Sequence, residues 1–176
     1  MHRTSLRLIV VAAVLLTGGW SVVRLLATPA SGFASTSLAV GRVGEIDVNI
    51  LEVSDNGADG TPGRNVWHSL QKTKGASDLY VQSNVWMPGG TSGWHTHPGH
   101  SLITVTQGAV TAYEGHDQSC TPKVYTVGMT FVDEGGDHVH VLRNEGTVEA
   151  RTITVQLIPA GAPRRIDAAG SPGCPF

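Results

Sequence analysis

Short runs in which apolar and polar residues alternate recur along most of the chain. Residues 45–53 place Ile46, Val48 and Ile50 on one face of an extended segment, with acidic or amide side chains on the other. Residues 79–87 alternate in the same way. Further β-rich runs lie at residues 66–70, 101–107, 109–114, 123–127, 129–132, 139–142 and 148–158. Because no 3.6-residue apolar repeat continues for three turns after the N-terminal segment, the pattern predicts about eight to ten short strands in a sandwich or barrel.

Residues 1–34 follow a different pattern. Two arginines precede an apolar run, and small residues follow it, which is the arrangement of a secretory signal. Cleavage after Ala30 or Ala34 would release a secreted or extracytoplasmic protein. The alternative is an uncleaved membrane anchor, because residues 6–27 are nearly long enough to span a bilayer, although Arg24 would have to reach the interface.

The composition fits one domain after this segment. The 176 residues include 22 glycines but only 6% aromatic residues, which suits short strands and tight turns better than a helical bundle. We expect a linker at residues 35–44, a single domain at 45–160 and a C-terminal tail at 161–176. Removing residues 1–34 leaves nine basic against fourteen acidic residues. A mildly acidic domain of this kind argues against nucleic acid as a partner.

Two pairs of histidines are candidates for chemistry. His95 and His97 lie in the glycine-framed stretch 89–108, and their two-residue spacing on a strand points both imidazoles to one face. His138 and His140 have the same spacing in a second glycine-framed stretch. One such pair is commonly solvated or hydrogen-bonded. Two pairs together indicate a transition-metal site with up to four nitrogen ligands.

The spacing around these histidines resembles the two motifs of the cupin family. The first motif places a glycine, His-x-His, a glutamate and a second glycine at set intervals, and the second begins with a glycine and ends in a histidine and an asparagine. The matching residues are Gly89, His95, His97, Gly108, Gly128, His140 and Asn144. The resemblance covers residues 80–160 and implies an all-β fold, a single cupin-type jelly-roll β-barrel with its site residues pointing inward.

Three positions depart from these motifs. Ser101 stands at the usual glutamate position, Glu134 stands where proline is usual, and the distance from Gly136 to His140 is one residue longer than the motif. A hydroxyl binds divalent metals far more weakly than a carboxylate does, so the resemblance implies three histidines plus water. With less of the metal's charge cancelled, the pKa of bound water would fall and an anionic substrate would be favoured.

The resemblance implies a divalent transition metal held by His95, His97 and His140. Iron, manganese, nickel and zinc all fit a nitrogen-rich site, and a metal-free pocket is the alternative. His138 could supply a fourth nitrogen or transfer protons at the barrel mouth, and Tyr113 is the other candidate acid–base residue. We expect structural roles for the remaining polar residues. Among the histidines, His68 should pack on a strand, His100 should lie in a loop or behind the ligands, and His116 should lie in a solvated turn. Asn144 should order the backbone near His140, and the acids of the turn should be Asp133, Glu134 and Asp137.

The implied function is the binding of a small organic molecule beside the metal, with dioxygenase-type oxidation as the leading chemistry. Two alternatives remain, a non-catalytic module that binds or senses a small molecule and a sugar isomerase. Fold alone cannot choose among them, because one fold hosts many activities. The expected partners are a small-molecule ligand, a membrane only through an N-terminal anchor, and a second copy of the chain if the barrel forms a homodimer.

Cys120 and Cys174 are the two cysteines of the sequence. An exported chain with two cysteines is expected to join them in a disulfide, because its compartment is oxidising. Such a bridge would tie the proline- and glycine-rich tail to the barrel. Two free thiols are the alternative, and thiolate ligation of the metal is less favoured because a loop and a tail would both have to reach the strand histidines.

Overall fold

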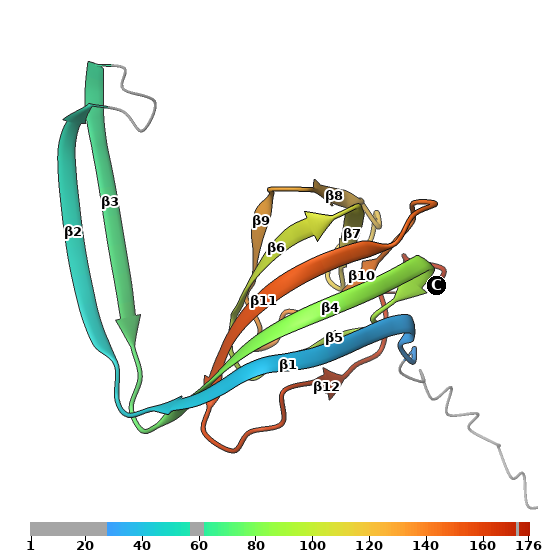
Figure 1. Cartoon of the computed structure of the whole chain (residues 1–176), viewed down its shortest axis with the longest axis horizontal. Helices are drawn as coiled ribbons and strands as arrows, with labels where there is room; N and C mark the ends of the chain where they lie inside the picture. Colours follow the sequence, from blue (N-terminus) through green and yellow to red (C-terminus); the bar gives the residue numbers. More distant parts are fainter. Residues whose placement is uncertain (1–27, 57–61, 172) are drawn as a thin grey trace, which may run out of the picture.

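The computed structural model describes residues 28–56, 62–171 and 173–176, and these residues form twelve β-strands and no helix (Figure 1). The apolar run of the expected signal or anchor therefore lies outside the described residues. In the part that is described, no helix is long and apolar enough to cross a membrane.

Ten of the strands form one antiparallel sheet that curls into a nearly closed barrel. The order along the sheet is β12-β5-β10-β4-β11-β6-β9, with β1 paired to β4, β7 paired to β10, and β8 paired to β7. This arrangement confirms the predicted all-β barrel. The strands of the barrel are β1 (Ser31–Val43), β4 (Ser77–Thr91), β5 (His95–Thr96), β6 (Ser101–Gln107), β7 (Ala109–Glu114), β8 (Lys123–Thr126), β9 (Thr130–Asp133), β10 (His140–Arg143), β11 (Ala150–Pro159) and β12 (Ile166–Asp167).

The interior of the barrel has an apolar part and a polar part. Alternate residues of each strand point inward, so Trp86, Ile103 and Val110 pack with their neighbours in a buried apolar cluster. Farther along β4 and β11 the inward residues are polar instead, and the Asn84 amide donates to Thr152 and Thr154 at 3.1 and 2.9 Å. Buried polar groups need partners, so this second part is the place for a polar ligand.

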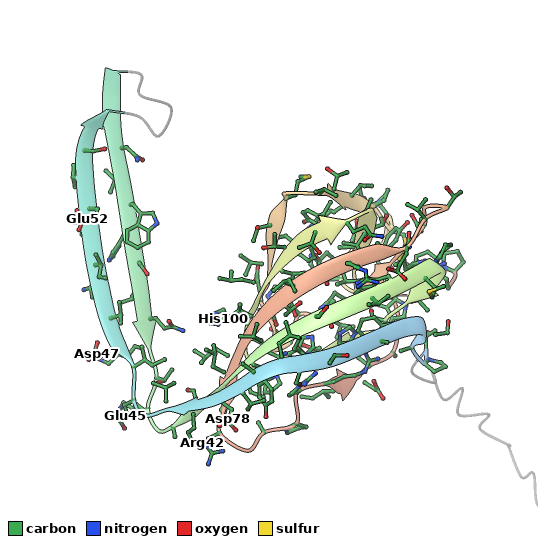
Figure 2. The ribbon with its side chains drawn as sticks, in the orientation of Figure 1. Arg42, Glu45, Asp47, Glu52, Asp78 and His100 are labelled. Atoms are coloured by element: carbon green, nitrogen blue, oxygen red, sulfur yellow. A yellow bond between two sulfur atoms is a disulfide. The ribbon has the colours of Figure 1, made fainter. Side chains whose placement is uncertain are left out.

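Residues 35–44 form most of strand β1 rather than the expected linker. This segment mixes small residues with Leu38, Val40 and Val43, all of which are exposed, so its own sequence gives little sign of a strand. Pairing with β4 holds it in place, and the Phe33 ring lies against Trp86 with 4.2 Å between ring centroids. At the other end, the Arg42 guanidinium donates to both carboxylate oxygens of Asp78, at 2.7 and 2.9 Å (Figure 2).

A two-stranded hairpin, β2 (Asp47–Asn56) and β3 (Pro62–Lys72), interrupts the barrel between β1 and β4. Figures 1 and 2 show it projecting away from the barrel, and among the described strands β2 and β3 pair only with each other. The expectation that residues 45–53 form a half-buried strand is therefore wrong about burial, since Ile50 and Leu51 are 44% and 59% exposed. Alternation identified the strand, but it could not identify which sheet the strand would join.

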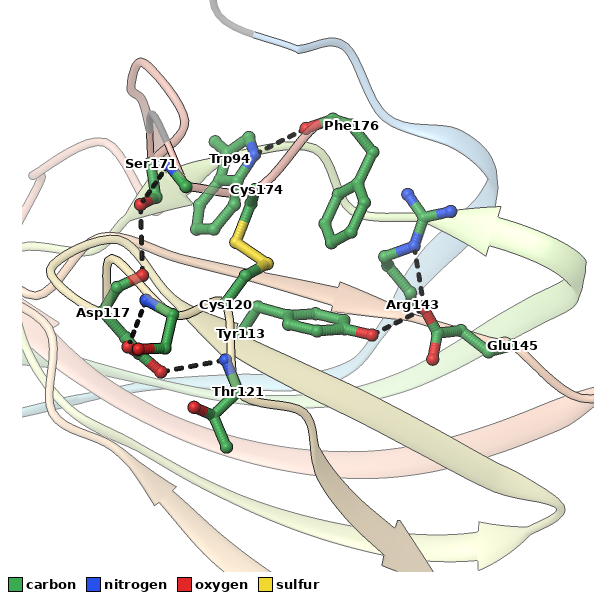
Figure 3. The surroundings of a disulfide bond; sticks show 12 residues. Trp94, Tyr113, Asp117, Cys120, Thr121, Arg143, Glu145, Ser171, Cys174 and Phe176 are labelled. Atoms are coloured by element: carbon green, nitrogen blue, oxygen red, sulfur yellow. Dashed lines mark hydrogen bonds and ion pairs between the residues drawn. A yellow bond between two sulfur atoms is a disulfide. The ribbon is translucent and has the colours of Figure 1, made fainter.

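The C-terminal tail is attached to the barrel, as Figure 3 shows. Cys120 and Cys174 form the predicted disulfide, with 5.2 Å between their Cα atoms. The Trp94 indole donates to the Phe176 carbonyl at 3.0 Å, and the guanidinium of Arg143 lies 4.2 Å from the centroid of the Phe176 ring. Strand β12 also belongs to the tail and pairs with β5, which carries the first histidine pair.

Candidate metal centre

Strand register brings three histidines of the two motifs to one place. β10 pairs with β5 so that His140 stands directly opposite His95, which points both rings to the same face. His97 follows His95 by two residues on the same face. One nitrogen from each of the three rings lies within 4.8 Å of the others. Nitrogens that share one metal ion at about 2.0–2.1 Å lie about 3 to 4 Å apart, so the cluster suits a single ion after small adjustments.

Hydrogen bonds to backbone carbonyls fix the orientation of the first two rings. Nδ1 of His95 lies 2.8 Å from the Gly93 carbonyl oxygen, and Nδ1 of His97 contacts the Arg164 carbonyl oxygen. A carbonyl only accepts, so each Nδ1 carries the proton and each Nε2 keeps a free lone pair. Metal-binding histidines in proteins are usually held in this way.

The electrostatics favour neutral imidazoles. Burial, followed by the charges of His140 and Arg165, lowers the pKa of His95 from 6.5 to about 2. Burial also lowers the pKa of His97, against the opposing influence of Asp133. Neutral imidazole is the ligating form, so these rings are ready for a metal at physiological pH.

A cavity of about 90 Å³ adjoins the three histidines inside the barrel. Several polar atoms at its wall are buried without a hydrogen-bond partner, namely Ser101 Oγ, Asp133 Oδ2, Gln156 Oε1 and Arg164 Nε. Buried polar atoms are rarely left unpaired in native proteins, so this group marks a place where a ligand or ion would complete the bonding. The donor set therefore fits a divalent metal with a polar molecule beside it.

Asp133 is a residue of this site that sequence analysis assigned to a turn. It ends β9 directly opposite Ser101 of β6. Its carboxylate oxygens lie 3.2 Å from Nε2 of His97 and 3.4 Å from Nδ1 of His140. The sequence carries no clear signal for this position, because the pairing of β6 with β9 cannot be read from spacing alone.

His138 and Tyr113 do not line the cavity beside the three histidines. Nε2 of His138 lies 3.0 Å from a Glu134 carboxylate oxygen, and its ring is 6.1 Å from that of His116. These residues line a second cavity of about 280 Å³, which His140 also borders. His138 is not supported as a fourth metal ligand, because it precedes strand β10 and only His140 of this pair joins the cluster.

Tyr113 points to the C-terminal tail instead of the cavity. Its hydroxyl donates to Glu145 at 2.8 Å, and its ring meets that of Phe176 edge to face (Figure 3). The alternation of side chains along β7 explains why Tyr113 points away from the cavity, because the preceding residue, Ala112, lies on the inner side of the strand. The arrangement gives Tyr113 a packing role and does not support it as an acid–base residue.

Asn144 has the structural role expected of it. Its amide nitrogen donates to the carbonyls of Trp86 and Val148, and its side-chain oxygen accepts from the Gly146 amide. It thereby fixes the turn after β10, the strand that begins with His140.

His68, expected from the sequence to be packed on a strand, lies on the exposed hairpin, where its Nε2 is 2.8 Å from the Asn49 side-chain oxygen.

The barrel and the convergence of both motifs on one interior site identify the fold. The chain has a cupin fold. No protein-family model matches the sequence, and a search of curated proteins found no significant match.

Solved structures overlap this cupin barrel in part. The polyketide cyclase RemF from Streptomyces resistomycificus has a TM-score of 0.44 and 18% identity, over 54% of this chain and 63% of its own. An oxalate oxidase has a TM-score of 0.42 and 21% identity, over 73% of this chain and 55% of its own. A predicted oxalate decarboxylase from Thermotoga maritima has a TM-score of 0.39 and 15% identity, over 48% of this chain and 83% of its own. Overlaps of this extent assign no reaction to the chain.

Proposed function

We propose that this cupin barrel holds a divalent transition metal through His95, His97 and His140 and binds a small organic molecule beside it. The observation that carries the proposal is the convergence of three ring nitrogens, within 4.8 Å of one another, at the wall of an interior cavity. Two of these rings are oriented by backbone carbonyls, so their free Nε2 lone pairs are positioned in advance. A set of three imidazole ligands accepts iron, manganese, nickel or zinc.

The cavity favours a small anionic ligand. Its volume of about 90 Å³ gives room for a small polar molecule beside the histidines. Arg164 and Arg165 line it together with the amides of Gln82, Asn84 and Gln156. A metal cation and the two arginines attract a carboxylate or enolate, although Arg165 also pairs with Asp167 at 2.5 Å. The amides supply donors and acceptors for the other polar atoms of such a ligand.

Oxidation of that molecule with molecular oxygen is the chemistry we favour. A bound redox-active metal would supply the activation of oxygen, while this chain's residues would bind the anion and exclude bulk water. Sugar isomerisation is the third candidate, and neither of the acid–base residues expected for it from the sequence, His138 and Tyr113, lines the cavity. A non-catalytic module that binds or senses the same anion is the second candidate, since it needs the site but no reaction.

The disulfide supports a function outside the cytoplasm. Disulfides persist mainly in oxidising compartments, and the Cys120–Cys174 bridge joins two segments of the folded chain. We propose that the protein is exported by its N-terminal segment, either released by cleavage or retained by an uncleaved anchor.

Oxygen consumption and ligand binding separate the two candidates. The iron-loaded protein would be titrated with small mono- and dicarboxylates by calorimetry, and oxygen uptake would be followed with an electrode. Binding with oxygen uptake that is lost in His97→Ala supports dioxygenase-type oxidation. Binding without oxygen uptake, with iron or any other metal, supports the binding module and contradicts the oxidation.

A further inference from the structure

Asp133 occupies the part of the site that the missing glutamate leaves open. Ser101, at the usual glutamate position of the first motif, and Asp133 are cross-strand partners on β6 and β9, and both line the cavity. Directly opposed residues in an antiparallel pair have Cβ atoms about 4.5–5.5 Å apart. A carboxylate on either strand can therefore reach the same point beside the histidines.

The two oxygens of the Asp133 carboxylate have different surroundings. Oδ1 accepts a hydrogen bond from the Gly135 amide at 3.2 Å and lies 3.4 Å from Nδ1 of His140. Oδ2 has no hydrogen-bond partner among the described residues, although its side chain is only 3% exposed. One oxygen is thus held in place and the other is free to bind.

The free oxygen faces the free nitrogen of His97. Nδ1 of His97 is occupied by the Arg164 carbonyl, so Nε2 carries the lone pair, and this Nε2 lies 3.2 Å from Asp133 Oδ2. Two lone pairs at this distance repel each other unless a proton or cation joins them. Two ligands bound to one metal at about 2.1 Å and at right angles lie about 3.0 Å apart. The observed separation is close to that value.

We propose that Asp133 is a carboxylate ligand of the metal, supplied from β9 in place of the glutamate absent at position 101. The site then consists of three histidines and one aspartate, so one negative charge partly cancels that of the metal. A carboxylate oxygen also makes the site more favourable for harder ions such as manganese than three imidazoles alone would be. This inference rests on the proposed metal site.

The test moves the carboxylate from one strand to the other. Manganese affinity would be measured by calorimetry for the wild type, for Asp133→Asn, and for Asp133→Asn combined with Ser101→Glu. Asp133→Asn keeps the shape of the side chain, and we expect it to weaken manganese binding at least tenfold, the order seen for residues that support a metal. The longer glutamate at position 101 should restore most of the lost affinity. The affinity for nickel, which prefers nitrogen ligands, should fall less in Asp133→Asn than the affinity for manganese.

Ser101→Glu in the wild-type background distinguishes a ligand from a residue that only orients His140. It should tighten manganese binding much less where Asp133 already supplies the carboxylate than in Asp133→Asn, and an equal gain in both would overturn Asp133 as a ligand. A glutamate on β6 can reach the metal, but it does not recreate the contacts of Asp133 Oδ1 with Gly135 and His140. Loss of affinity without rescue, in variants that keep the wild-type circular dichroism spectrum, would overturn Asp133 as a ligand. So would an unchanged affinity in Asp133→Asn while the wild type binds metal. A wild type that binds no metal would overturn the proposed function itself.

Discussion

At the residue scale, the motif spacing predicts three of the four residues that meet in the site. The two-residue spacing of His95 and His97 and the match of His140 to the second motif follow from sequence alone. Asp133 does not, because its position depends on the register between β6 and β9, which is set by packing over the whole barrel. Ser101 is an indirect sequence signal for a carboxylate elsewhere in the site, because a serine at the usual glutamate position leaves the negative charge to be supplied by another residue.

His95 should make the metal-free protein less stable in acid. Its pKa is about 2 in the folded protein and 6.5 when unperturbed, so below pH 6.5 the unfolded chain binds a proton that the folded chain does not. The contribution of His95 to stability is therefore intact above pH 6.5 and falls progressively as the pH decreases toward 2. Melting temperatures of chelator-treated protein between about pH 8 and about pH 5 should decline, and less so in His95→Gln. Equal decline in both proteins would contradict this account.

At the element scale, alternation predicts strands well and their neighbours poorly. Strands β6, β7 and β11 lie where the pattern places them, because β6 and β11 bury alternate residues and the centre of β7 is buried on both faces. Strand β1 is missed because it is held by pairing with β4 and not by a buried alternating face. The two strands of the hairpin are predicted but their pairing and exposure are not, because a repeat of two residues also occurs in strands whose two faces are both exposed.

Removal of the hairpin should leave the barrel folded. Deleting residues 46–73 joins β1 to β4 through a short loop, and this is tolerable because Val43 and Ser77, the last and first residues of those strands, are already paired. The hairpin contributes little burial to the barrel, since its large apolar residues are exposed. We expect a cooperative melt within a few degrees of the wild type and unchanged metal affinity. An unfolded product, or loss of the metal, would show that the hairpin supports the barrel.

Strand β1 also discriminates between the two cleavage sites. Cleavage after Ala34 would remove Phe33, whose ring packs on the buried Trp86, whereas cleavage after Ala30 keeps the strand whole. The exported protein should begin at Ser31, or retain Met1 if the segment is an anchor. Intact-mass spectrometry measures this directly, and a mature chain beginning at Ser35 would contradict the prediction.

At the scale of the whole molecule, the fold class and the disulfide were both predictable. The barrel follows from many short strands plus the motif spacing, and the bridge follows from two cysteines in a chain whose sequence predicts export. The route of the tail was not predictable, because it depends on contacts such as that of Trp94 with Phe176. Pairing of two barrels in a homodimer stays a prediction.

The disulfide should stabilise the tail and the barrel together. Its 54-residue separation corresponds to roughly 4 kcal/mol in the chain-entropy model, an upper figure because the barrel already restrains part of the loop. Urea unfolding with and without reductant should show a loss of up to about that free energy. Thiol titration of the unreduced, denatured protein should give almost no free thiol. Two thiols per chain would remove the bridge and weaken the case for export.

Metal content tests the central claim most directly. The protein from residue 31 onward, loaded with manganese or zinc and then desalted, would be analysed by inductively coupled plasma mass spectrometry beside a His95→Ala/His97→Ala variant and a His116→Ala control. We expect about one ion per chain in the wild type and the control, and almost none in the double variant, because it keeps only one of the three histidines. Stoichiometric metal in the double variant, or no metal in the wild type, would contradict the account.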